Sequence, residues 1–436
     1  MTLVETAKVM LWGSLIGAVT WQEDRKRSVF QYAPDFIRSH IQVAPLTMPL
    51  RDFPYEFPAL PWPMFRGLPG LLADSLPDRW GNAVINAWLA SQNRAAESFS
   101  PVERLSYIGK RGMGALEFEP AILGNSTQSK IVDLEKMVNL TNRILERRTS
   151  LQGVFSGEDD KDAIENILRI GTSAGGARAK AILAWNPVTN EFRSGQLDQS
   201  EGFQYWLMKF DGIRNNRDKE LCDPLGYGKV EYAYYLMASA AGIVMNECKL
   251  HQEGGRSHFM TRRFDRIQEG KKIHMQSLGA IAHFDFNQAG AYSYEQVIQI
   301  IRRLDLPRED LEQQVLRALF NVVARNQDDH VKNIAFLMNK QGEWRLSPAF
   351  DLTYAMNPHG EWTCQHQMSI NSKLDDFDRE DLLAFCKNAG IKKNQADDMF
   401  ERVVKTVRNW PLYAVKAGVP EDWIDNIQST LRTNLL

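Results

Sequence analysis

Residues 321–354 read NVVARNQDDHVKNIAFLMNKQGEWRLSPAFDLTY, and this stretch is the most informative part of the chain. Asp328 lies five residues before Asn333, and a further acid, Asp351, follows after two short apolar runs. The residues NKQG at 339–342 lie between those runs and have the composition of a turn, so the pattern predicts a β-hairpin. Such a hairpin would return Asp351 to the side of Asn333, and we expect one polar site there.

This spacing is typical of enzymes that transfer phosphoryl groups. In a kinase catalytic loop an aspartate accepts the proton of the attacking hydroxyl, and an asparagine five residues later holds magnesium together with a later aspartate. Magnesium prefers hard oxygen ligands and keeps several of its waters. We therefore predict a phosphotransferase in which Asp328 is the base and Asn333 and Asp351 bind the metal, with His330 and Lys332 supporting the loop.

Two alternatives remain within this segment. Asp329 competes for the role of base, but it lies only four residues before Asn333, so the spacing favours Asp328 and would leave Asp329 to anchor the loop. The other alternative is a polar surface loop without catalytic function, because Asn, Asp and Gln are common in turns. Against it stands Asp351, which lies between Phe350 and Leu352, since an acid in apolar surroundings needs a cation or hydrogen-bond donors.

A glycine-rich stretch upstream is a candidate phosphate loop. Residues 171–180 contain glycines and small side chains, whose backbone N–H groups can approach phosphate oxygens closely, and an expected strand at 181–185 follows. The P-loop pattern GxxxxGK[ST] is absent, and a lone glycine-rich turn is as readily structural.

Lys209 is the candidate cation for the phosphates. It lies in an apolar, strand-like segment at 205–210, where a buried ammonium requires an anionic partner. The alternative is an edge strand whose lysine faces water. Glu231, near the start of a helix expected over 230–241, is the candidate partner of Lys209, or an acid that interacts with the positive end of the helix dipole.

The remaining pattern predicts a strand-rich start followed by helices. Helices are expected at 78–91, 131–148, 310–325, 381–388, 395–410 and 421–431 from their apolar periodicity. The helix at 310–325 has apolar residues at four-residue spacing and would deliver Asp328 on a rigid support.

Several motifs, in the same order, make the chain similar to the HipA family of bacterial serine/threonine kinase toxins. They are SAGGARAK at 173–180, WLMKF at 206–210, RFDR at 263–266, NQDDHVKN at 326–333 and SPAFD at 347–351. A further stretch, LLADSLPD at 71–78, resembles a motif of the family's N-terminal subdomain, so the likeness covers most of the chain.

The resemblance implies a fold, an activity and partners. The fold is α+β and bilobal, with a strand-containing N-terminal subdomain at 1–125, a nucleotide-binding part at 126–250 and a catalytic, largely α-helical C-terminal lobe at 251–436. The activity is ATP- and magnesium-dependent phosphorylation of serine or threonine by the toxin of a toxin–antitoxin pair. The partners are a small DNA-binding antitoxin similar to HipB and a protein substrate from translation, such as an aminoacyl-tRNA synthetase. Contact with DNA is expected only through the antitoxin.

The resemblance also implies roles for individual residues. Nucleotide binding falls to Ser173, Ala174, Gly175, Gly176, Ala177, Arg178, Ala179, Lys180 and Lys209. Ser173 aligns with the serine that HipA-type kinases autophosphorylate, and Thr172 is an adjacent alternative acceptor. Asp265 receives no catalytic role, because alternating Arg and Asp usually form a structural ion-pair cluster.

Composition excludes several other classes. The 436 residues are 44% hydrophobic and 24% charged, as in ordinary globular proteins, and the formal net charge of −2 argues against a broadly basic nucleic-acid surface. The four cysteines show no CxxC pairing and the histidines no HExxH, so no soft-metal site is expected. The apolar run at 9–19 fits strand, turn and strand better than a signal peptide, and we expect a cytoplasmic protein without a membrane span.

Two rival functions share most of these features. A small-molecule kinase would use the same ATP and magnesium site, and a non-catalytic kinase-like binding module would keep the fold. The complete set of Asp328, Asn333 and Asp351 argues against lost chemistry.

Overall fold

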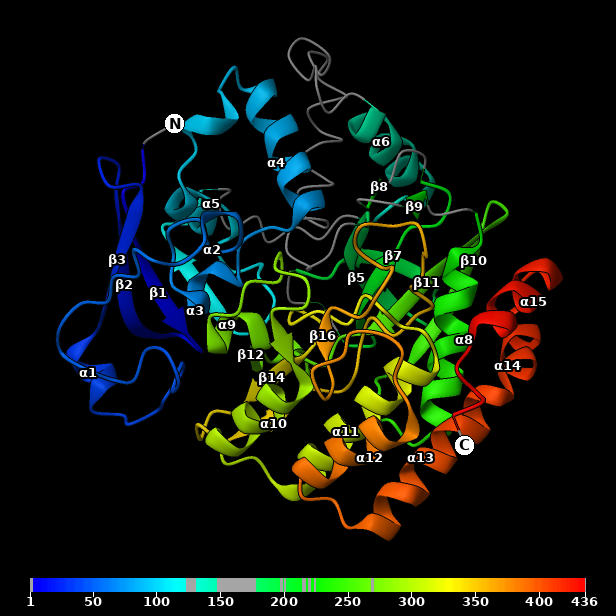
Figure 1. Ribbon diagram of the computed structural model, residues 1–436. Helices are drawn as coiled ribbons and strands as arrows, with labels where there is room; N and C mark the ends of the chain where they lie inside the picture. The colour runs from blue at the N-terminus through cyan, green and yellow to red at the C-terminus, as the bar shows by residue number, and fades with distance from the viewer. Residues whose placement is uncertain are drawn as a thin grey trace. The chain divides into compact units, whose positions relative to one another are not determined.

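A computed structural model describes residues 3–122, 131–146, 178–196, 199, 201–213, 217–218, 221–222, 225–267 and 270–435 (Figure 1). The chain divides into two compact units. Unit 1 comprises Met1–Leu225, His251–Gln276 and Met338–Glu343, and unit 2 comprises Gly226–Leu250, Ser277–Leu337 and Trp344–Leu436. The boundaries predicted at 125 and 250 are not tested by this division and stay predictions.

Unit 1 begins with a four-stranded antiparallel sheet. Its strands are β1 (Thr6–Leu11), β2 (Ser14–Gln22), β3 (Arg27–Tyr32) and β4 (Leu116–Glu119), in the order β3-β2-β1-β4. The turn between β1 and β2 consists of Trp12 and Gly13, which both have positive φ (50° and 82°), as a two-residue hairpin turn requires. The predicted strand, turn and strand at this position are therefore confirmed.

Unit 1 also contains helices, two of which begin with side-chain caps. The helices are α1 (Pro34–Ile37), α2 (Trp62–Phe65), α3 (Gly70–Ala73), α4 (Arg79–Ser91), α5 (Pro101–Ile108) and α6 (Leu134–Glu146), with a 3-10 turn η1 (Ala96–Ser98). Asp78 caps α4 by accepting a hydrogen bond of 2.6 Å from the N–H of Gly81. A capping box of Ser100 and Glu103 begins α5. The helices predicted at 78–91 and 131–148 are thus present as α4 and α6.

A second sheet in unit 1 carries the candidate phosphate-binding lysines. Its strands are β5 (Lys180–Asn186), β6 (Glu191–Ser194), β7 (Gln204–Lys209), β10 (Cys248–Glu253) and β11 (Arg256–Arg262), in the order β10-β11-β7-β5-β6. A hydrophobic core that includes Trp80, Trp88, Tyr107 and Trp206 joins α4, α5 and α6 to this sheet. Since β7 is an interior strand, the alternative that placed Lys209 on an edge strand is wrong.

The RFDR motif forms a buried ion-pair cluster in unit 1. The side-chain nitrogens of Arg263 lie 2.9 and 2.7 Å from the carboxylate of Asp265, Arg266 lies 2.8 Å away, and the N–H of Gly114 donates a further bond of 2.7 Å. Burial disfavours the charged carboxylate, but the two guanidinium groups hold the pKa of Asp265 below its usual range. The structural function expected for this motif is confirmed.

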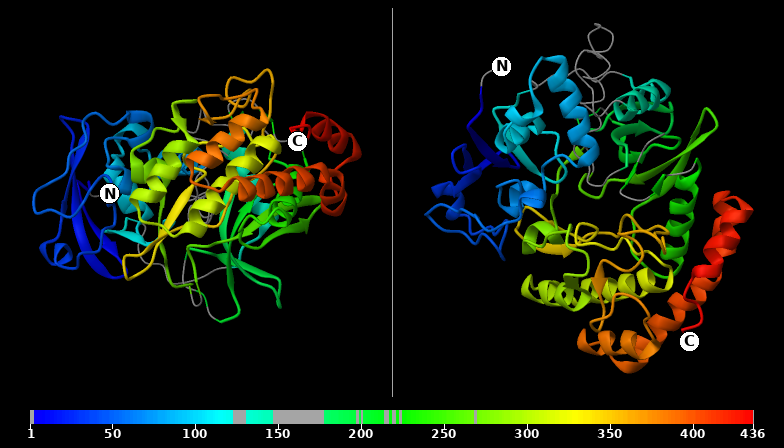
Figure 2. Two further views of the ribbon diagram at one scale, coloured as in Figure 1. Left: turned by 60° about the horizontal axis from the view of Figure 1, so that its bottom comes forward. Right: turned by 45° about the horizontal axis from the view of Figure 1, so that its top comes forward.

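Unit 2 is largely helical. Its helices are α8 (Tyr227–Ala240), α9 (Leu278–Ala282), α10 (Tyr294–Arg303), α11 (Arg308–Val323), α12 (Arg379–Asn388), α13 (Lys393–Arg408), α14 (Trp410–Ala417) and α15 (Glu421–Thr430). Helix α13 packs against α11 and α12, and α14 packs along α8 (Figures 1 and 2). The aromatic ring of Tyr234 on α8 contacts Phe320 on α11 and Trp410 on α14.

Short strands complete the fold. They are β8 (Arg217–Asp218) and β9 (Leu221–Cys222), β12 (His274–Ser277), β13 (Tyr292–Ser293), β14 (Ala335–Met338), β15 (Trp344–Leu346) and β16 (Met368–Ser369). Strands β14 and β15 are neighbours, and the Asn339 N–H donates to the carbonyl of Glu343 across the turn between them. The hairpin predicted around NKQG is therefore present.

Several helices were not predicted from the sequence, among them α5, α10 and α14. The pattern at 395–410 continues into α14, which starts at Trp410 with Pro411 in its first turn. Proline is well accommodated at that position because the first N–H groups of a helix have no intrahelical partner. None of the helices in the described part of the chain combines the length and apolar character that a membrane span requires.

Candidate active site

The predicted catalytic loop follows α11 directly. The hydroxyl of Tyr234 donates to the carbonyl of Ala324 at 2.5 Å, which fixes the end of that helix. Arg325 then turns the chain with a φ of +55°. Further on, the side-chain amide of Asn333 donates to the carbonyl of Asp328 at 2.8 Å, so the loop is closed on itself. The five-residue spacing therefore corresponds to a direct contact.

Asp329 is buried, and three donors surround its carboxylate. Its side chain has no exposed surface. Oδ1 accepts from the N–H of Gln367 at 2.7 Å, and Oδ2 accepts from the hydroxyl of Tyr294 and from Nδ1 of His366, both at 2.8 Å. Burial and the neighbouring carboxylate raise the pKa of Tyr294 well above its ordinary value, so its hydroxyl remains a donor. The expectation that Asp329 anchors the loop agrees with this geometry.

The anchoring network extends to the segment that follows α15. Nη1 of Arg432 lies 3.2 Å from Nε2 of His366. A guanidinium can only donate, so Nε2 must accept, and the ring proton therefore lies on Nδ1 and points to Asp329. Burial, with nearby Arg325, lowers the pKa of Arg432 to about 9, which still leaves it charged at neutral pH.

Asp328, in contrast, is accessible. Its side chain is 34% exposed. Oδ1 accepts a hydrogen bond of 2.8 Å from the indole Nε1 of Trp362 and lies 3.8 Å from Nε2 of His330. Nδ1 of His330 accepts from the N–H of Lys332 at 3.2 Å, which places the proton of a neutral ring on Nε2, facing Asp328. Of the two adjacent acids, Asp328 is the one that a substrate hydroxyl can reach.

Asp351 is held near the catalytic loop by backbone pairing on both sides. The N–H of Ser347 donates to the carbonyl of Ala335 at 2.9 Å, and the N–H of Ala355 donates to the carbonyl of Arg325 at 3.1 Å. Between these points Asp351 has a φ of +54°, a left-handed conformation that is uncommon for residues other than glycine. Such conformations cluster at functional sites, where surrounding contacts impose them.

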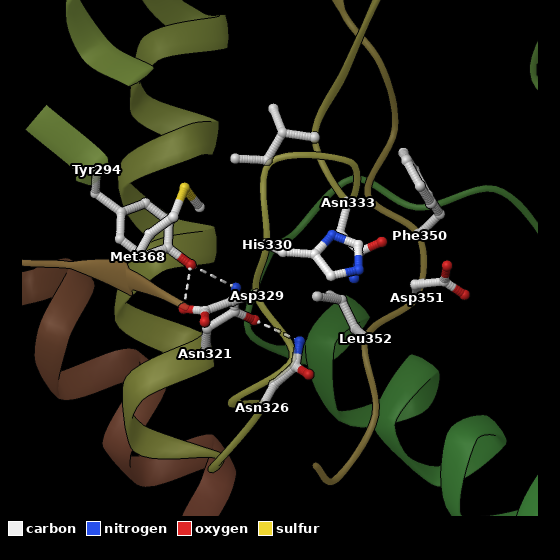
Figure 3. Close-up of a pocket in the computed structure, with 11 residues that line it drawn as sticks. Tyr294, Asn321, Asn326, Asp329, His330, Asn333, Phe350, Asp351, Leu352 and Met368 are labelled. Carbon is white, nitrogen blue, oxygen red and sulfur yellow. Dashed lines mark hydrogen bonds between the residues drawn. The ribbon is translucent and has the colours of Figure 1, made fainter. Parts of the chain in front are cut away.

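Asn333 and Asp351 line the same pocket in unit 2, with His330, Phe350 and Leu352 (Figure 3). Asp329, Tyr294 and Asn321 lie on its other side. Because the amide nitrogen of Asn333 is bound to the Asp328 carbonyl, its oxygen Oδ1 is the atom that can act as a ligand. Within the described ranges, no three His, Cys, Asp or Glu side chains could hold a metal by themselves. A carboxylate and an amide oxygen do suit magnesium, which takes phosphate and water oxygens for the rest of its shell.

In unit 1, Lys180 and Lys209 are direct neighbours across β5 and β7. Residues opposite each other in an antiparallel pair project from the same face of the sheet, so the two ammonium groups share one face. Lys180 is buried and its Nζ lies 3.5 Å from Oδ2 of Asp78, the residue that caps α4. The ammonium of Lys209 lies 5.8 Å from the ring centre of Phe259. Two ammonium groups on one face of the sheet favour an anion beside them.

The remaining predicted residues are only partly described. Residues 171–177, which include Thr172, Ser173, Ala174, Gly175, Gly176 and Ala177, lie outside the described residues. Arg178 is half-buried and Ala179 is buried at the start of β5. Glu231 is buried in α8, which starts at Tyr227 and thus places this acid beyond the first turn. Glu231 belongs to unit 2 and Lys209 to unit 1, and their pairing stays a prediction.

Sequence reasoning missed four residues of this region. Asp78 lies in the LLADSLPD stretch, but nothing local indicates that it pairs with Lys180. Tyr294, His366 and Trp362 belong to segments without a functional pattern, and each meets the catalytic loop through a single hydrogen bond across at least 34 positions of sequence. No signal in one sequence could have found these partners.

The two neighbouring acids are expected to respond differently to the same substitution. Asp329→Asn exchanges a buried acceptor oxygen for a donor that faces Tyr294 or His366, so we expect it to lower the free energy of unfolding by roughly 2–4 kcal/mol. Asp328→Asn, at a partly exposed position, should change it by less than about 1 kcal/mol. Denaturant unfolding of both variants measures this difference, and equal stabilities would contradict the anchoring function of Asp329.

Comparison with known proteins identifies the family. The HipA-like C-terminal domain matches residues 172–410, more than half of the chain, and the HipA N-terminal domain matches residues 7–119. The kinase-named protein Y4mE of Sinorhizobium fredii (strain NBRC 101917 / NGR234) is 25% identical over 166 residues, which are 36% of this chain. The chain spans 39% of the length of that relative.

One solved structure shows a similar fold over nearly the whole chain. A chain of the Shewanella oneidensis MR-1 toxin–antitoxin complex of HipA, HipB and operator DNA has a TM-score of 0.70 and 18% identity, over 98% of this chain and 96% of that one. The Helicobacter pylori proinflammatory kinase CtkA has a TM-score of 0.35 and 14% identity, over 60% of this chain and 94% of its own. The α+β kinase-like fold predicted from the sequence is confirmed, and the chain belongs to the HipA family.

Proposed function

We propose that this protein is an ATP- and magnesium-dependent serine/threonine protein kinase and the toxin of a toxin–antitoxin pair. The observation that carries the proposal is the division between two adjacent acids, because Asp329 is buried among three donors and Asp328 is left accessible on a braced loop. A general base needs both a fixed position and access to its substrate. Family membership supports the same chemistry.

In the proposed reaction, Asp328 accepts the proton of the serine or threonine hydroxyl as that oxygen attacks the γ-phosphorus of ATP. The side chains of Asn333 and Asp351 would hold magnesium through Oδ1 and the carboxylate. The ion, when bound, would supply charge neutralisation on the phosphates. His330 keeps its N–H toward Asp328, and Lys332, whose ammonium lies 5.0 Å from the ring centre of Phe286, maintains the loop beside the base.

We assign nucleotide binding to unit 1. Lys180 and Lys209 present two ammonium groups on one face of the sheet, which suits the phosphates of ATP. Residues 173–179 would cover those phosphates with backbone N–H groups, as the sequence predicts. Glu231 is retained as the proposed partner of Lys209.

The partners follow from the family. Because the Shewanella structure is a complex of HipA with HipB and operator DNA, we propose a small HipB-like antitoxin for this chain, and DNA contact only through it. A cytoplasmic protein of translation, such as an aminoacyl-tRNA synthetase, is the proposed substrate. Serine/threonine specificity and the substrate rest on the resemblance alone.

Removing the base should abolish most of the activity. We expect Asp328→Asn to reduce phosphoryl transfer by roughly 10²-fold or more, the scale of a lost general base, with ATP affinity changed little. The control is Asp398→Asn, which makes the same change at an exposed position of α13. Transfer of labelled γ-phosphate to protein measures the rate; full activity of the Asp328 variant would reject the proposed mechanism.

Asp351 is expected to determine how nucleotide binding depends on magnesium. Asp351→Ala removes the only anionic group that we assign to the metal. Magnesium should then strengthen ATP binding by no more than a small factor, and the affinity for ATP without magnesium should stay the same. Titration calorimetry with magnesium and with a chelator gives both values. An unchanged magnesium dependence would exclude Asp351 from the metal site.

Ser173 is the proposed site of self-inactivation. A phosphate there adds close to two negative charges to a loop that receives the phosphates of ATP, and repulsion should expel the loop or the nucleotide. We expect incubation with magnesium-ATP to place phosphate on the peptide that contains Ser173 while activity declines, and Ser173→Ala to stay active. Thr172→Ala is the matched control. Active protein without phosphate on Ser173, or a fully active sample that is homogeneously phosphorylated there, would contradict this.

A further inference from the structure

The indole of Trp362 contacts the carboxylate that we assign as the base. Its Nε1 donates to Oδ1 of Asp328 at 2.8 Å, and the tryptophan is half-buried. The centre of the indole lies 6.4 Å from the centre of the His330 ring in a T-shaped arrangement. The His330 ring also contacts Phe286, at 5.5 Å between ring centres. The base is thus bordered by an aromatic side chain that comes from outside the catalytic loop.

Trp362 belongs to a segment that is fastened to the catalytic loop at several points. Besides the indole contact, His366 and Gln367 both bind the carboxylate of Asp329, through Nδ1 at 2.8 Å and through the backbone N–H at 2.7 Å. The side-chain amide of Gln367 also donates to the carbonyl of Trp362. The position of the indole is therefore set by the same buried acid that anchors the loop.

The preceding residues hold Trp362 from the other side. The N–H of Asn357 donates to the carbonyl of Thr363 at 3.1 Å, and the N–H of Gly360 donates to the carbonyl of Asn357 at 3.0 Å, so residues 357–363 form a closed turn. An indole carried on a closed and anchored turn has little freedom to leave its hydrogen bond. The contact is built into the fold of unit 2.

The chemistry of the indole determines what the contact can do. Its N–H is a donor only, so it can neither take the proton from the substrate nor replace Asp328 as the base. A carboxylate offers about four acceptor positions, so the indole contact on Oδ1 is compatible with a substrate hydroxyl on the same group. A donor on one oxygen limits rotation of the carboxylate about its last torsion, and reaction rates depend steeply on such orientation.

We propose that Trp362 is a positioning residue that orients the Asp328 carboxylate for proton acceptance, and that residues 362–367 act as a strap over the catalytic loop. This inference rests on the proposed kinase function. It assigns to Trp362 an effect on turnover rather than on nucleotide binding, because the indole donates its hydrogen bond to the proposed base.

Trp362→Phe tests the inference, since it keeps an aromatic ring beside His330 and removes the N–H. We expect kcat to fall by roughly tenfold, the scale of a lost orienting contact, while KM for ATP and the affinity for magnesium-ATP stay within about twofold. Trp423→Phe is the matched control, because Trp423 is also half-buried but lies on α15, and it should keep the original kcat. Adding Trp362→Phe to Asp328→Asn should lower the residual rate no further, since both changes act through one group.

Several results would overturn the inference. A kcat of Trp362→Phe equal to that of the unaltered protein would show that the hydrogen bond orients nothing, and a higher kcat would show that the indole obstructs the base. A further, independent loss in the Asp328→Asn background would show that Trp362 acts elsewhere. In each of these cases the proposed function stands, provided that Asp328→Asn is impaired; an unaltered protein that transfers no phosphate would defeat both.

Discussion

The buried carboxylate of Asp329 is the interaction on which the arrangement of unit 2 depends. A charged group without exposed surface is stable only when donors satisfy it, and here three donors come from two separate segments, Tyr294 from one and the adjacent His366 and Gln367 from the other. Arg432 extends the set by fixing the tautomer of His366. Because Asp329 is held inward, the preceding residue, Asp328, is presented outward, five positions from Asn333. The burial of Asp329 therefore explains both the position of the proposed base and its accessibility.

A comparable constraint operates in unit 1, where cationic groups rather than an acid are concentrated. Lys180 and Lys209 face each other across two interior strands, and Asp78 compensates one of them from the cap of α4. Asp78 thereby links the N-terminal helices to the sheet through charge as well as through the apolar core around Trp80. In the proposed function, the phosphates of ATP bind beside these two lysines.

The sequence predicted what depends on local spacing. The five-residue interval between Asp328 and Asn333, the hairpin at 339–342, the strands around Lys180 and Lys209 and most of the longer helices are all encoded within windows of a few residues. It could not predict contacts between distant segments, such as Trp362 with Asp328 or Asp78 with Lys180, because a single residue carries no periodicity. Helix α14 was missed because Pro411, which follows the helical pattern at 395–410, suggests the end of a helix rather than the first turn of a new one. The phosphate loop at 173–180 and the pairing of Lys209 with Glu231 remain predictions.

In the proposed function, this site transfers phosphate from ATP to a protein hydroxyl. The most direct measurement adds purified protein and ATP labelled at the γ-phosphate to a cell extract, with Asp328→Asn as the parallel sample, and follows the label into proteins and into small molecules. We expect label on serine or threonine of a protein band, and we expect this labelling to require unaltered Asp328. Label that enters only small molecules, or labelling that is identical with the variant, would contradict the proposed function.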